Sequence, residues 1–545
     1  MNLYVISNIN LDSFKDELLS TKIDNVSFAG YNQYINELID VNSNLNKKKY
    51  DLVFFHLDGD QLFKFSIEND EFIYDDDTFI YFINSLSKFL AENSNTNIII
   101  SGINISSITS YNNLDSFVKN SFFEIQFSTN KKIKELSRKY TNLHYFDFPS
   151  IVSKFGETQL IDYKFWYLGR IKYSHFGMKI ISNYFTSLIN GIFGSTKKVL
   201  VLDLDNTLWG GVIGEDGLDG IELSEDGIGK IFRDFQNEIL KLKSLGILLA
   251  ICSKNNSSDV DEVFENHKMM LLKSDDFTVK KINWQNKSNN IREIASELNL
   301  GLDSIVFIDD NPVEREFVKK SIPEVNVPDF PVEIFNLKDW FINDVIYRYF
   351  SKISISNEDV NKKSQYERNI KRVKEKDISL SLEDYLKGLK MKIKLTLDDR
   401  NSIPRLSQLT QKTNQFNLST IRYSENEIEN LMNDKNKFVF SSVYEDKFGN
   451  EGIISVLIAE IINKKEVFID TFLMSCRVIG RKVETKILKE VLERLEEEHE
   501  IKSVKMNFNA TKKNILAKKF YDECGFTEST KNIEINNLIS KLNET

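Results

Sequence analysis

The sequence predicts an α/β protein of three domains. Short apolar runs of strand length alternate with helical patterns along the chain, which is typical of parallel sheets covered by helices. Several of these runs are apolar at every position, as expected for strands buried on both faces. The chain has 545 residues, more than one hydrophobic core usually serves. We expect α/β domains at residues 1–194, 195–345 and 386–545, joined by a helical linker at 346–385 whose charged run forms a solvated face.

The composition excludes several classes of protein. The net charge is −10 and no basic patch is interleaved with aromatic residues, so we expect no nucleic-acid partner. The longest apolar runs are strand-sized, so we expect no membrane span. The chain has three cysteines and starts on an apolar strand without a basic leader, which indicates a reducing, cytoplasmic location.

The first domain has the pattern of an α/β unit but an incomplete catalytic set. Its expected strands are residues 3–6, 52–55, 97–100 and 144–146. Ser7 follows the first strand and His175 lies late in the domain, an arrangement that loosely resembles SGNH hydrolases. The carboxylate of the D-x-x-H motif is missing, because Lys172 stands three residues before His175. A serine whose histidine lacks an orienting carboxylate is poorly activated, so we expect an SGNH-like scaffold or carrier-docking module without catalysis.

Two carboxylates close the first strand of the second domain. The apolar run 199–202 ends on Asp203 and Asp205, and Thr207 follows. Alternate strand residues face the same side, and ligands of parallel sheets bind beyond the carboxyl ends of the strands. Both carboxylates can therefore converge on one cation or phosphoryl group. An aspartate pair alone could simply begin a turn.

Further polar positions follow in a defined order. The strand 246–252 ends on Ser253, Lys287 stands at the start of a helix, and the strand 304–308 ends on Asp309 and Asp310. The set resembles the motifs of the haloacid-dehalogenase-like (HAD) superfamily, which begin with D-x-D-x-T. This order is hard to reconcile with chance, so the set indicates a phosphoryl-handling site.

The HAD resemblance implies a role for each residue. Asp203 would be the nucleophile, Asp205 the general acid and base, and Lys287 the cation that neutralises nucleophile and phosphate. The further phosphate contacts are assigned to Thr207, Ser253 and Lys254. The cofactor would be Mg²⁺, because hard oxygen ligands favour it. Its ligands are assigned to Asp203, Asp205 through the backbone carbonyl, and Asp309 or Asp310.

The spacing leaves no room for a large cap domain over this site. Only 34 residues separate Ser253 from Lys287, and a loop and one helix fit between Thr207 and the next strand. The glycine-rich segment 210–217 could be at most a flap. An uncapped site can admit a bulky substrate or a partner protein, unless another domain covers it.

The third domain combines an expected sheet with two short signatures. Its strands are expected at residues 438–443, 452–462 and 466–474, followed by a helix at 483–495. The ending 520–526 (FYDECGF) and the turn 477–482 (RVIGRK) resemble the F-Y-x-x-x-G-F ending and the R-x-x-G-x-G/A diphosphate loop of GCN5-related N-acetyltransferases (GNAT). Such a loop binds the coenzyme diphosphate at a helix start. Lys482 replaces the final small residue, which puts ordinary acetyl-CoA binding in doubt, although lysine can contact a phosphate.

Four blocks together resemble the FkbH-like family, in which a HAD domain of type IIIC is fused to a GNAT-like domain. They are residues 203–211 (DLDNTLWGG), 307–315 (FIDDNPVER), 409–417 (LTQKTNQFN) and 470–481 (DTFLMSCRVIGR). The resemblance covers nearly the whole chain and implies a D-glyceryl-ACP synthase-like enzyme of polyketide-type biosynthesis. Such an enzyme takes 1,3-bisphosphoglycerate, removes phosphate, and delivers glyceryl as a thioester to a phosphopantetheinylated acyl carrier protein.

A thioester pathway needs a thiol, and Cys476 is our candidate. It lies at a strand end beside Arg477 and opens onto the expected helix start, and both features favour a thiolate. The alternative is a small core residue, the role that we expect for Cys252 and Cys524. No histidine is near Cys476 in sequence, so no Cys-His pair is indicated. Acyl or pantetheine contacts are assigned to Gln411, Asn414, Gln415, Asn417, Arg477, Gly480 and Arg481; the first four could instead form a plain polar loop.

Three other functions remain open. A HAD phosphatase with an accessory domain would release free glycerate without forming a thioester. An acyl-CoA-dependent acyltransferase is weakened by Lys482. A non-catalytic assembly scaffold is disfavoured by the complete HAD set.

Overall fold

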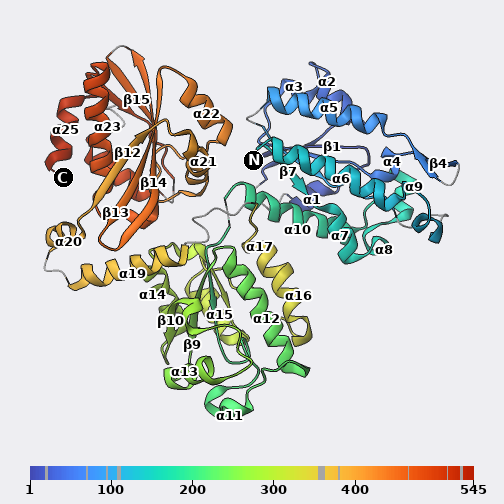
Figure 1. Ribbon diagram of the computed structural model, residues 1–545, viewed down its shortest axis with the longest axis horizontal. Helices are drawn as coiled ribbons and strands as arrows, with labels where there is room; N and C mark the ends of the chain where they lie inside the picture. Colours follow the sequence, from blue (N-terminus) through green and yellow to red (C-terminus); the bar gives the residue numbers. More distant parts are fainter. Residues whose placement is uncertain are drawn as a thin grey trace. The chain divides into compact units, whose positions relative to one another are not determined.

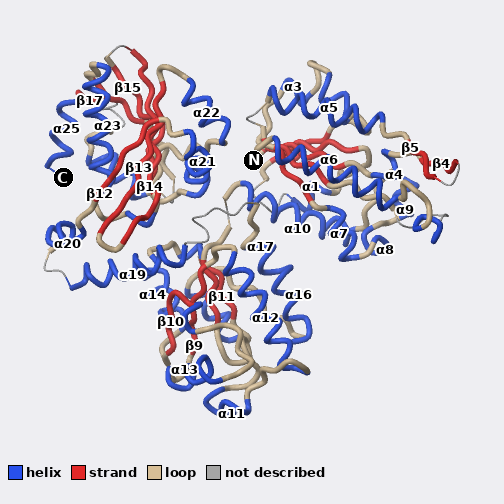
Figure 2. The backbone as a smooth tube through the Cα atoms, viewed as in Figure 1, coloured by secondary structure: helices blue, strands red, loops and turns tan. Residues whose placement is uncertain are grey.

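The computed structural model describes residues 1–18, 23–68, 71–93, 96–106, 112–194, 196–353, 362–378, 381–463, 465–511, 514–527 and 532–544 (Figure 1, Figure 2). The chain divides into two compact units, Met1–Ile189 with Ser424–Glu427, and Asn190–Tyr423 with Ile428–Thr545. The first unit holds a five-stranded sheet and a small hairpin, and the second holds sheets of four and six strands. The predicted α/β class is confirmed.

No helix among the described residues combines the length and the apolar character that a membrane span requires.

The first unit is built on a parallel sheet in the order β2-β1-β3-β6-β7. Its strands are β1 (Asn2–Ser7), β2 (Asn25–Phe28), β3 (Leu52–His56), β6 (Asn97–Ser101) and β7 (Leu143–Phe146), and β4 (Phe65–Glu68) and β5 (Glu71–Tyr74) form the hairpin. Its helices are α1 (Phe14–Leu18), α2 (Tyr34–Ile39), α3 (Asn44–Lys47), α4 (Gly59–Leu62), α5 (Asp77–Glu92), α6 (Phe122–Lys139), α7 (Phe148–Phe155), α8 (Glu157–Leu160), α9 (Tyr163–Gly169) and α10 (His175–Ile192). The strand order reverses at β1, so the carboxyl ends of β1 and β3 form a topological switch point.

The second unit begins with a four-stranded parallel sheet in the order β10-β9-β8-β11. Its strands are β8 (Val199–Leu202), β9 (Leu248–Ser253), β10 (Phe277–Ile282) and β11 (Ile305–Ile308). Its helices are α11 (Ile213–Gly220), α12 (Gly227–Ser244), α13 (Ser257–Asn266), α14 (Lys287–Leu298), α15 (Pro312–Ser321), α16 (Leu337–Trp340) and α17 (Tyr347–Tyr349). Between β8 and β9 the chain forms α11 and α12 alone, so the predicted lack of a large cap is confirmed.

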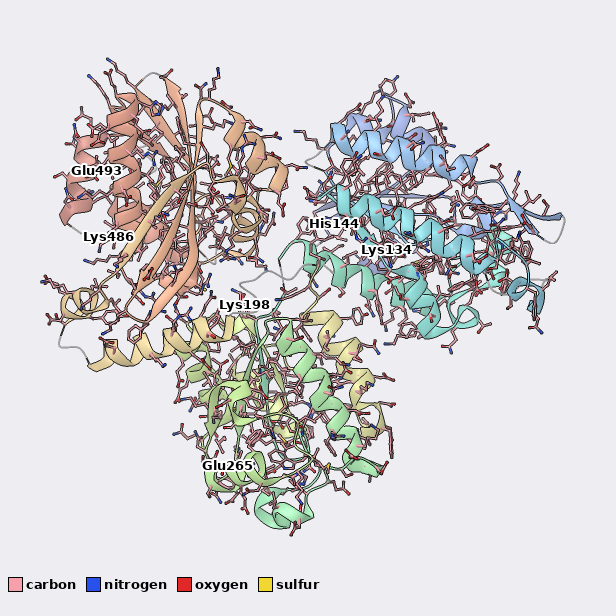
Figure 3. All side chains as sticks on the ribbon, viewed as in Figure 1. Lys134, His144, Lys198, Glu265, Lys486 and Glu493 are labelled. Atoms are coloured by element: carbon pink, nitrogen blue, oxygen red, sulfur yellow. The ribbon has the colours of Figure 1, made fainter. Side chains whose placement is uncertain are left out.

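Alternation along β8 divides the core of this domain into two layers. Leu200 and Leu202 pack with Phe235 of α12 on one face, whereas Val199 and Val201 pack with Ile291 of α14 on the other. Successive strand residues point to opposite faces, so a run of four apolar residues requires apolar cover on both. Side chains accordingly fill both sides of the sheet (Figure 3).

The six-stranded sheet of the second unit has the order β12-β13-β14-β15-β16-β17. Its strands are β12 (Lys392–Leu397), β13 (Lys437–Asp446), β14 (Gly449–Asn463), β15 (Glu466–Met474), β16 (Ser503–Met506) and β17 (Asn532–Glu534), and only the β15–β16 pair is parallel. Its helices are α20 (Leu382–Leu389), α21 (Ile403–Lys412), α22 (Glu425–Asn433), α23 (Val483–His499), α24 (Ile515–Glu523) and α25 (Ile535–Glu544). This mixed sheet lies in the region for which the sequence predicts a GNAT-like domain.

Segment 416–418 takes the place of β16 along the second half of β15. β16 pairs with β15 only as far as Ile469. Beyond that point Asn417 bridges Leu473, Leu418 N donates to Phe472 O at 3.0 Å, and Met474 N donates to Phe416 O at 3.0 Å. The chain itself therefore closes this part of the strand edge.

The linker differs from its prediction in two respects. Phe350 is buried in the α12-side core layer, so the domain of the four-stranded sheet extends past residue 345, the end that the sequence predicts. The linker helix, α19 (Lys362–Ile378), is not simply solvated, because its Arg372 is 1% exposed. A buried arginine must be paired with carboxylates, and these lie far along the chain.

A buried ion-pair cluster lies at the switch point of the first unit. Lys172 pairs with Asp58 and, at 2.9 Å, with Asp60. Asn8, which follows β1, donates to Asp58 O at 3.1 Å and accepts from Asp58 N at 2.7 Å. Burial raises the pKa of Asp58 to about 6, even though Lys172 opposes the shift. Lys172, which replaces the D-x-x-H carboxylate, therefore has a structural partner.

We expect Lys172→Met to destabilise the first unit by roughly 3–5 kcal/mol at pH 8, since it leaves a buried carboxylate without its cation. The pKa of Asp58 lies above its ordinary value of 3.8, so its protonation favours the folded state at low pH, and this contribution is lost as pH rises through about 6. The loss in the variant should therefore be smaller at pH 5 than at pH 8. Denaturant unfolding, monitored by hydrogen exchange in the peptide containing β3, measures it.

The matched control is Lys164→Met, because Lys164 is an exposed lysine on nearby α9. It should change stability by no more than about 0.5 kcal/mol. Equal effects of the two substitutions, or a pH-independent loss for Lys172→Met, would contradict the ion-pair account.

Candidate active site

Three carboxylates converge at the carboxyl end of the four-stranded sheet. Asp203 directly follows β8, and Asp309 and Asp310 directly follow β11. β8 and β11 are parallel neighbours with Leu202 paired to Ile308, so their ends coincide. One oxygen from each carboxylate lies within 4.8 Å of the others. Asp203 and Asp309 are buried, so the three carboxylates form an enclosed site and not a cluster on the surface.

Lys287 is the cation of this cluster. It is the first residue of α14, and its Nζ lies 3.0 Å from Asp203 Oδ1 and 2.6 Å from Asp309 Oδ2. Burial alone would lower the pKa of Lys287, but the charges of Asp203 and Asp309 together raise it above its ordinary value. Lys287 therefore stays protonated at neutral pH.

The charges and ligand atoms of the cluster fit a divalent cation. Burial, reinforced by the charge of Asp203, raises the pKa of Asp309 and of Asp310 to about 6, a shift that a bound cation would oppose. Three carboxylates and one ammonium leave a charge of −2. Asp203 Oδ1 is buried, and Lys287 Nζ lies 3.0 Å from it. Buried carboxylate oxygens of this kind are the ligands that Mg²⁺ prefers.

Asp205 is oriented by a separate set of donors. Its Oδ1 accepts from Trp209 Nε1 at 3.0 Å and from Ile213 N at 3.1 Å. Its Oδ2 accepts from Asn255 Nδ2 at 3.0 Å. Asn255 also donates to Ser253 Oγ at 3.2 Å, which connects the loops after β8 and β9. Three donors hold the Asp205 carboxylate in one orientation beside the cluster.

The remaining predicted residues also lie at this edge. Thr207 is fully buried, and its Oγ1 accepts from Asp310 N at 3.3 Å. Ser253 is buried at the end of β9, and Lys254 Nζ pairs with Glu314 Oε1 at 2.5 Å. The structure thus brings together every residue that was assigned to the phosphoryl site.

Sequence reasoning gave no role to two residues that fix this geometry. Asn255 holds Asp205, and Arg315 Nη1 donates to the backbone carbonyls of Asp309 at 2.9 Å and Asp310 at 2.5 Å. Arg315 stands in the block that ends DDNPVER, but nothing in a sequence pattern distinguishes a carbonyl contact from a surface arginine. The polar run after Ser253 was the only available signal for Asn255.

Cys476 lies away from the carboxylate cluster. It opens a short turn after β15, is partly buried, and packs against the α14-side core layer. Its backbone carbonyl accepts from Asn299 Nδ2 at 2.8 Å, and Asn299 is the residue that ends α14. A helix rises 1.5 Å per residue, so the twelve residues of α14 place Asn299 roughly 18 Å from Lys287.

Most of the other residues assigned to acyl or pantetheine binding make contacts within the chain. Arg477 and Arg481 are buried and bond to α19, and Gly480 is exposed with φ +82°. Asn417 is buried and accepts from Thr420 N at 2.9 Å. Gln411 donates to Tyr423 O at 3.3 Å, and Asn414 accepts from Arg422 Nη2 at 2.9 Å. Gln415 lies near Gly301 of the phosphoryl-handling domain. Their roles toward a ligand stay predictions.

One solved structure is similar to most of the chain. The N-terminal part of the protein BF1531 from Bacteroides fragilis, which contains a phosphatase domain complexed with Mg, is 30% identical and has a TM-score of 0.58. The similarity covers 65% of this chain and 95% of that chain. No protein-family model and no curated protein matches the chain.

Two acetyltransferases are similar to the last part of the chain at a lower level. Mutant forms of the spermidine/spermine N-acetyltransferase SpeG from Vibrio cholerae are 16% identical over 28% of this chain and 98% of that one, with a TM-score of 0.22. Ard1 from Thermoplasma volcanium is 16% identical over 27% of this chain and 95% of that one, with a TM-score of 0.20.

We expect Asp203→Asn to abolish Mg²⁺-dependent phosphate release from a small phosphate ester while leaving the fold intact. The amide removes both the negative charge at the cluster and the oxygen that would attack phosphorus. Phosphate release in Mg²⁺ and in EDTA measures the effect. Asp226→Asn, at an exposed aspartate of the same domain, is the matched control. Undiminished turnover by Asp203→Asn, or by the unchanged protein in EDTA, would refute the assignment.

Proposed function

The chain belongs to the HAD phosphatase family, as does the N-terminal part of BF1531, and from this membership we propose a Mg²⁺-dependent enzyme that releases phosphate from a phosphorylated three-carbon acid. The observation that carries the proposal is the convergence of Asp203, Asp309 and Asp310 around Lys287. Mg²⁺ would be held by these carboxylates and the backbone carbonyl of Asp205. The ion would supply positive charge to the transferring phosphoryl group.

Each side chain of the site has a separate role in the proposed phosphoryl transfer. Asp203 attacks phosphorus, and the bond from phosphorus to the leaving oxygen breaks. Asp205 donates a proton to that oxygen and then takes one from the water that hydrolyses the aspartyl phosphate. Lys287 balances the charge of Asp203 and of the phosphate throughout. Thr207, Ser253 and Lys254 supply the further contacts that orient the phosphate.

The finer proposal is glyceryl transfer to an acyl carrier protein. 1,3-Bisphosphoglycerate carries an acyl phosphate and a phosphate ester. A thiolate attacks the acyl carbon, a C–S bond forms, the C–O bond breaks and inorganic phosphate leaves; the ester phosphate is hydrolysed at the HAD site. Glyceryl then passes to the phosphopantetheine thiol of the carrier, for polyketide-type biosynthesis in the cytoplasm. The four FkbH-like sequence blocks support this reading.

Cys476 is the proposed acyl-carrying thiol. Its turn begins the segment 476–482, which leads into α23, and the segment contains Arg477 and Arg481. Because Asn299, whose side chain bonds to Cys476 O, lies roughly 18 Å along α14 from Lys287, phosphate hydrolysis and thioester formation would take place at separate positions. The substrate must therefore move between the two steps.

One observation favours an alternative function, and another disfavours a second alternative. The same separation favours a HAD phosphatase whose last domain is only an accessory. Conversely, an acyl-CoA-dependent acyltransferase is disfavoured by the side chain of Lys482, which stands where the diphosphate loop ends on a small residue, at a position whose φ of +55° suits glycine. Release of free glycerate with no thioester would establish the phosphatase alternative.

We expect Cys476 to carry glyceryl as a thioester. Incubation with Mg²⁺ and 1,3-bisphosphoglycerate, without carrier, should give a hydroxylamine-labile glyceryl adduct on the peptide that contains Cys476. Intact-protein and peptide mass spectrometry detect it. Cys476→Ser should lose carrier loading or stall as a more stable oxygen ester, because exchange between two thiols is nearly isoenergetic and exchange from an oxygen ester is not.

The chain provides its own control for this experiment. Cys252 and Cys524 are buried, and burial raises the pKa of both thiols, so neither should be acylated. Full carrier loading by Cys476→Ala would exclude the covalent intermediate and leave direct attack by the carrier thiol on the acyl phosphate.

The first unit is proposed to act as a scaffold or carrier-docking module. Ser7 is 8% exposed and its Oγ accepts from Ile9 N at 3.1 Å. His175 is exposed and lies 3.7 Å from Glu17, while Lys172 takes the place of the expected carboxylate. The set lacks the buried carboxylate–histidine pair that activates a serine.

Ser7→Ala should accordingly leave glyceryl transfer within a few-fold of the unchanged protein, as followed by carrier mass. Removal of a true nucleophile costs on the order of 10³ or more in rate. A loss of that size would show that the first unit contributes an active serine.

A further inference from the structure

Helix α19 lies against the turn and loop that carry Cys476. Gln365 of α19 accepts from Arg477 Nη1, and Asn369, one helical turn later, accepts from Arg481 Nη2 at 2.7 Å. Gln365 and Asn369 are buried. Tyr366 of α19 is buried in the same core layer that Cys476 packs against. One face of α19 therefore covers segment 476–481.

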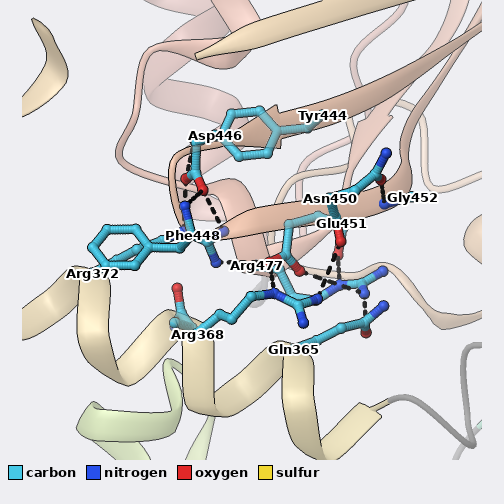
Figure 4. Close-up of polar contacts among 12 residues, drawn as sticks. Gln365, Arg368, Arg372, Tyr444, Asp446, Phe448, Asn450, Glu451, Gly452 and Arg477 are labelled. Carbon is cyan, nitrogen blue, oxygen red and sulfur yellow. Dashed lines mark hydrogen bonds and ion pairs between the residues drawn. The ribbon is translucent and has the colours of Figure 1, made fainter. Parts of the chain in front are cut away.

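Arg372 fixes the next turn of α19 to the hairpin between β13 and β14. Its Nε and Nη2 donate to the two oxygens of Asp446, each at 2.7 Å, and its Nη1 donates to Glu451 Oε1 at 2.7 Å (Figure 4). Asp446 and Glu451 are 0% exposed. Burial would raise the pKa of Asp446, but Arg372 holds it below its ordinary value. A paired guanidinium fork of this kind is among the strongest side-chain contacts.

The contacts of α19 with the loop are weaker than those with the hairpin. Arg481 bonds to the Asn369 amide oxygen and, at 2.5 Å, to the Arg477 carbonyl, while Asp446 Oδ2 lies 4.0 Å from its Nη1. Arg481 Nη1 is buried and donates no hydrogen bond. Neutral amide oxygens attract a guanidinium less than an anion does. A phosphate-bearing ligand would therefore compete well for the positions that Gln365 and Asn369 occupy.

We propose that α19 is a displaceable cover over Cys476 and its loop, and that the Arg372 contacts with Asp446 and Glu451 hold it closed. The inference rests on the proposed ligand-binding role of segment 476–482, but its test uses neither glyceryl nor carrier. Displacement of the helix would expose the thiol and free two guanidinium groups together. Access to Cys476 would then be set by α19 and not by the phosphoryl site.

Thiol labelling tests the proposal, since the chain has three cysteines in different surroundings. The folded full-length protein is treated with iodoacetamide, and peptide mass spectrometry gives a rate for Cys476, Cys524 and Cys252. Arg372→Ala should raise the Cys476 rate at least about tenfold, because it removes the buried guanidinium that pairs with both Asp446 and Glu451. Lys371→Ala, at the exposed neighbour of Arg372 on α19, should leave the rate unchanged.

Two cysteines act as reporters of unfolding. Cys252 reports the domain of the four-stranded sheet, and Cys524 reports the domain of the six-stranded sheet. Both are buried and should stay at their original rates in every variant. An unchanged Cys476 rate in folded Arg372→Ala would overturn the proposal, and so would a parallel rise for Cys524. If Arg372→Ala does not fold, Arg372→Lys keeps the charge but loses the fork, and its Cys476 rate should exceed that of the unchanged protein; an equal rate would overturn the proposal.

Failure of this test is distinct from failure of the proposed function. Labelling requires only that the reagent reach a reactive thiol, whereas the glyceryl adduct requires that the thiol also react with the acyl phosphate. If Arg372→Ala speeds labelling but Cys476 never carries glyceryl, the cover is supported and the acyl role is refuted. If Cys476 carries glyceryl but Arg372→Ala leaves its labelling rate unchanged, the acyl role is supported and the cover is refuted.

Discussion

The phosphoryl site depends on the ion pairs of Lys287 with Asp203 and Asp309. Asp203 and Asp309 lie at the ends of neighbouring strands, and their charges would repel without a cation between them. Lys287 removes one of three negative charges and leaves two, the charge that a divalent cation balances. A second lysine at this site would reduce the negative charge that attracts a divalent cation. Without Lys287, the buried carboxylates would favour their protonated forms.

The position of Lys287 is set by α14, and the same helix reaches the domain that contains the six-stranded sheet. Ile291 and Ile294 pack α14 against β8 and β11, which fixes the lysine at one end. At the other end Asn299 bonds to the carbonyl of Cys476. One rigid element therefore defines both places where chemistry is proposed, and also the distance between them. Any mechanism for the chain has to include transport over that distance.

Much of the phosphoryl site could be predicted because its signals are local. A strand covered on both faces reads as a short apolar run, and the residues that follow it must lie at the sheet edge, which places Asp203, Ser253 and Asp309. The contact of Asn255 with Asp205 and that of Arg315 with two carbonyls could not be predicted, because they depend on loop conformation. Arg372 was expected to be solvated; its partners Asp446 and Glu451 are 74 and 79 residues away, and no periodicity reports such a contact.

Segment 416–418 pairs with the second half of β15, so a ligand that bound along this strand edge would also affect how well the edge is protected from aggregation. An open strand edge presents free N–H and C=O groups and is a template for pairing with other chains. Here the chain protects that edge with its own backbone, next to the turn of Cys476. A pantetheine arm that bound along this edge would have to replace the protecting segment. Substitutions that loosen segment 416–418 to let a ligand bind faster would also expose the edge of β15. Aggregation through that edge would therefore limit how far ligand binding can be accelerated.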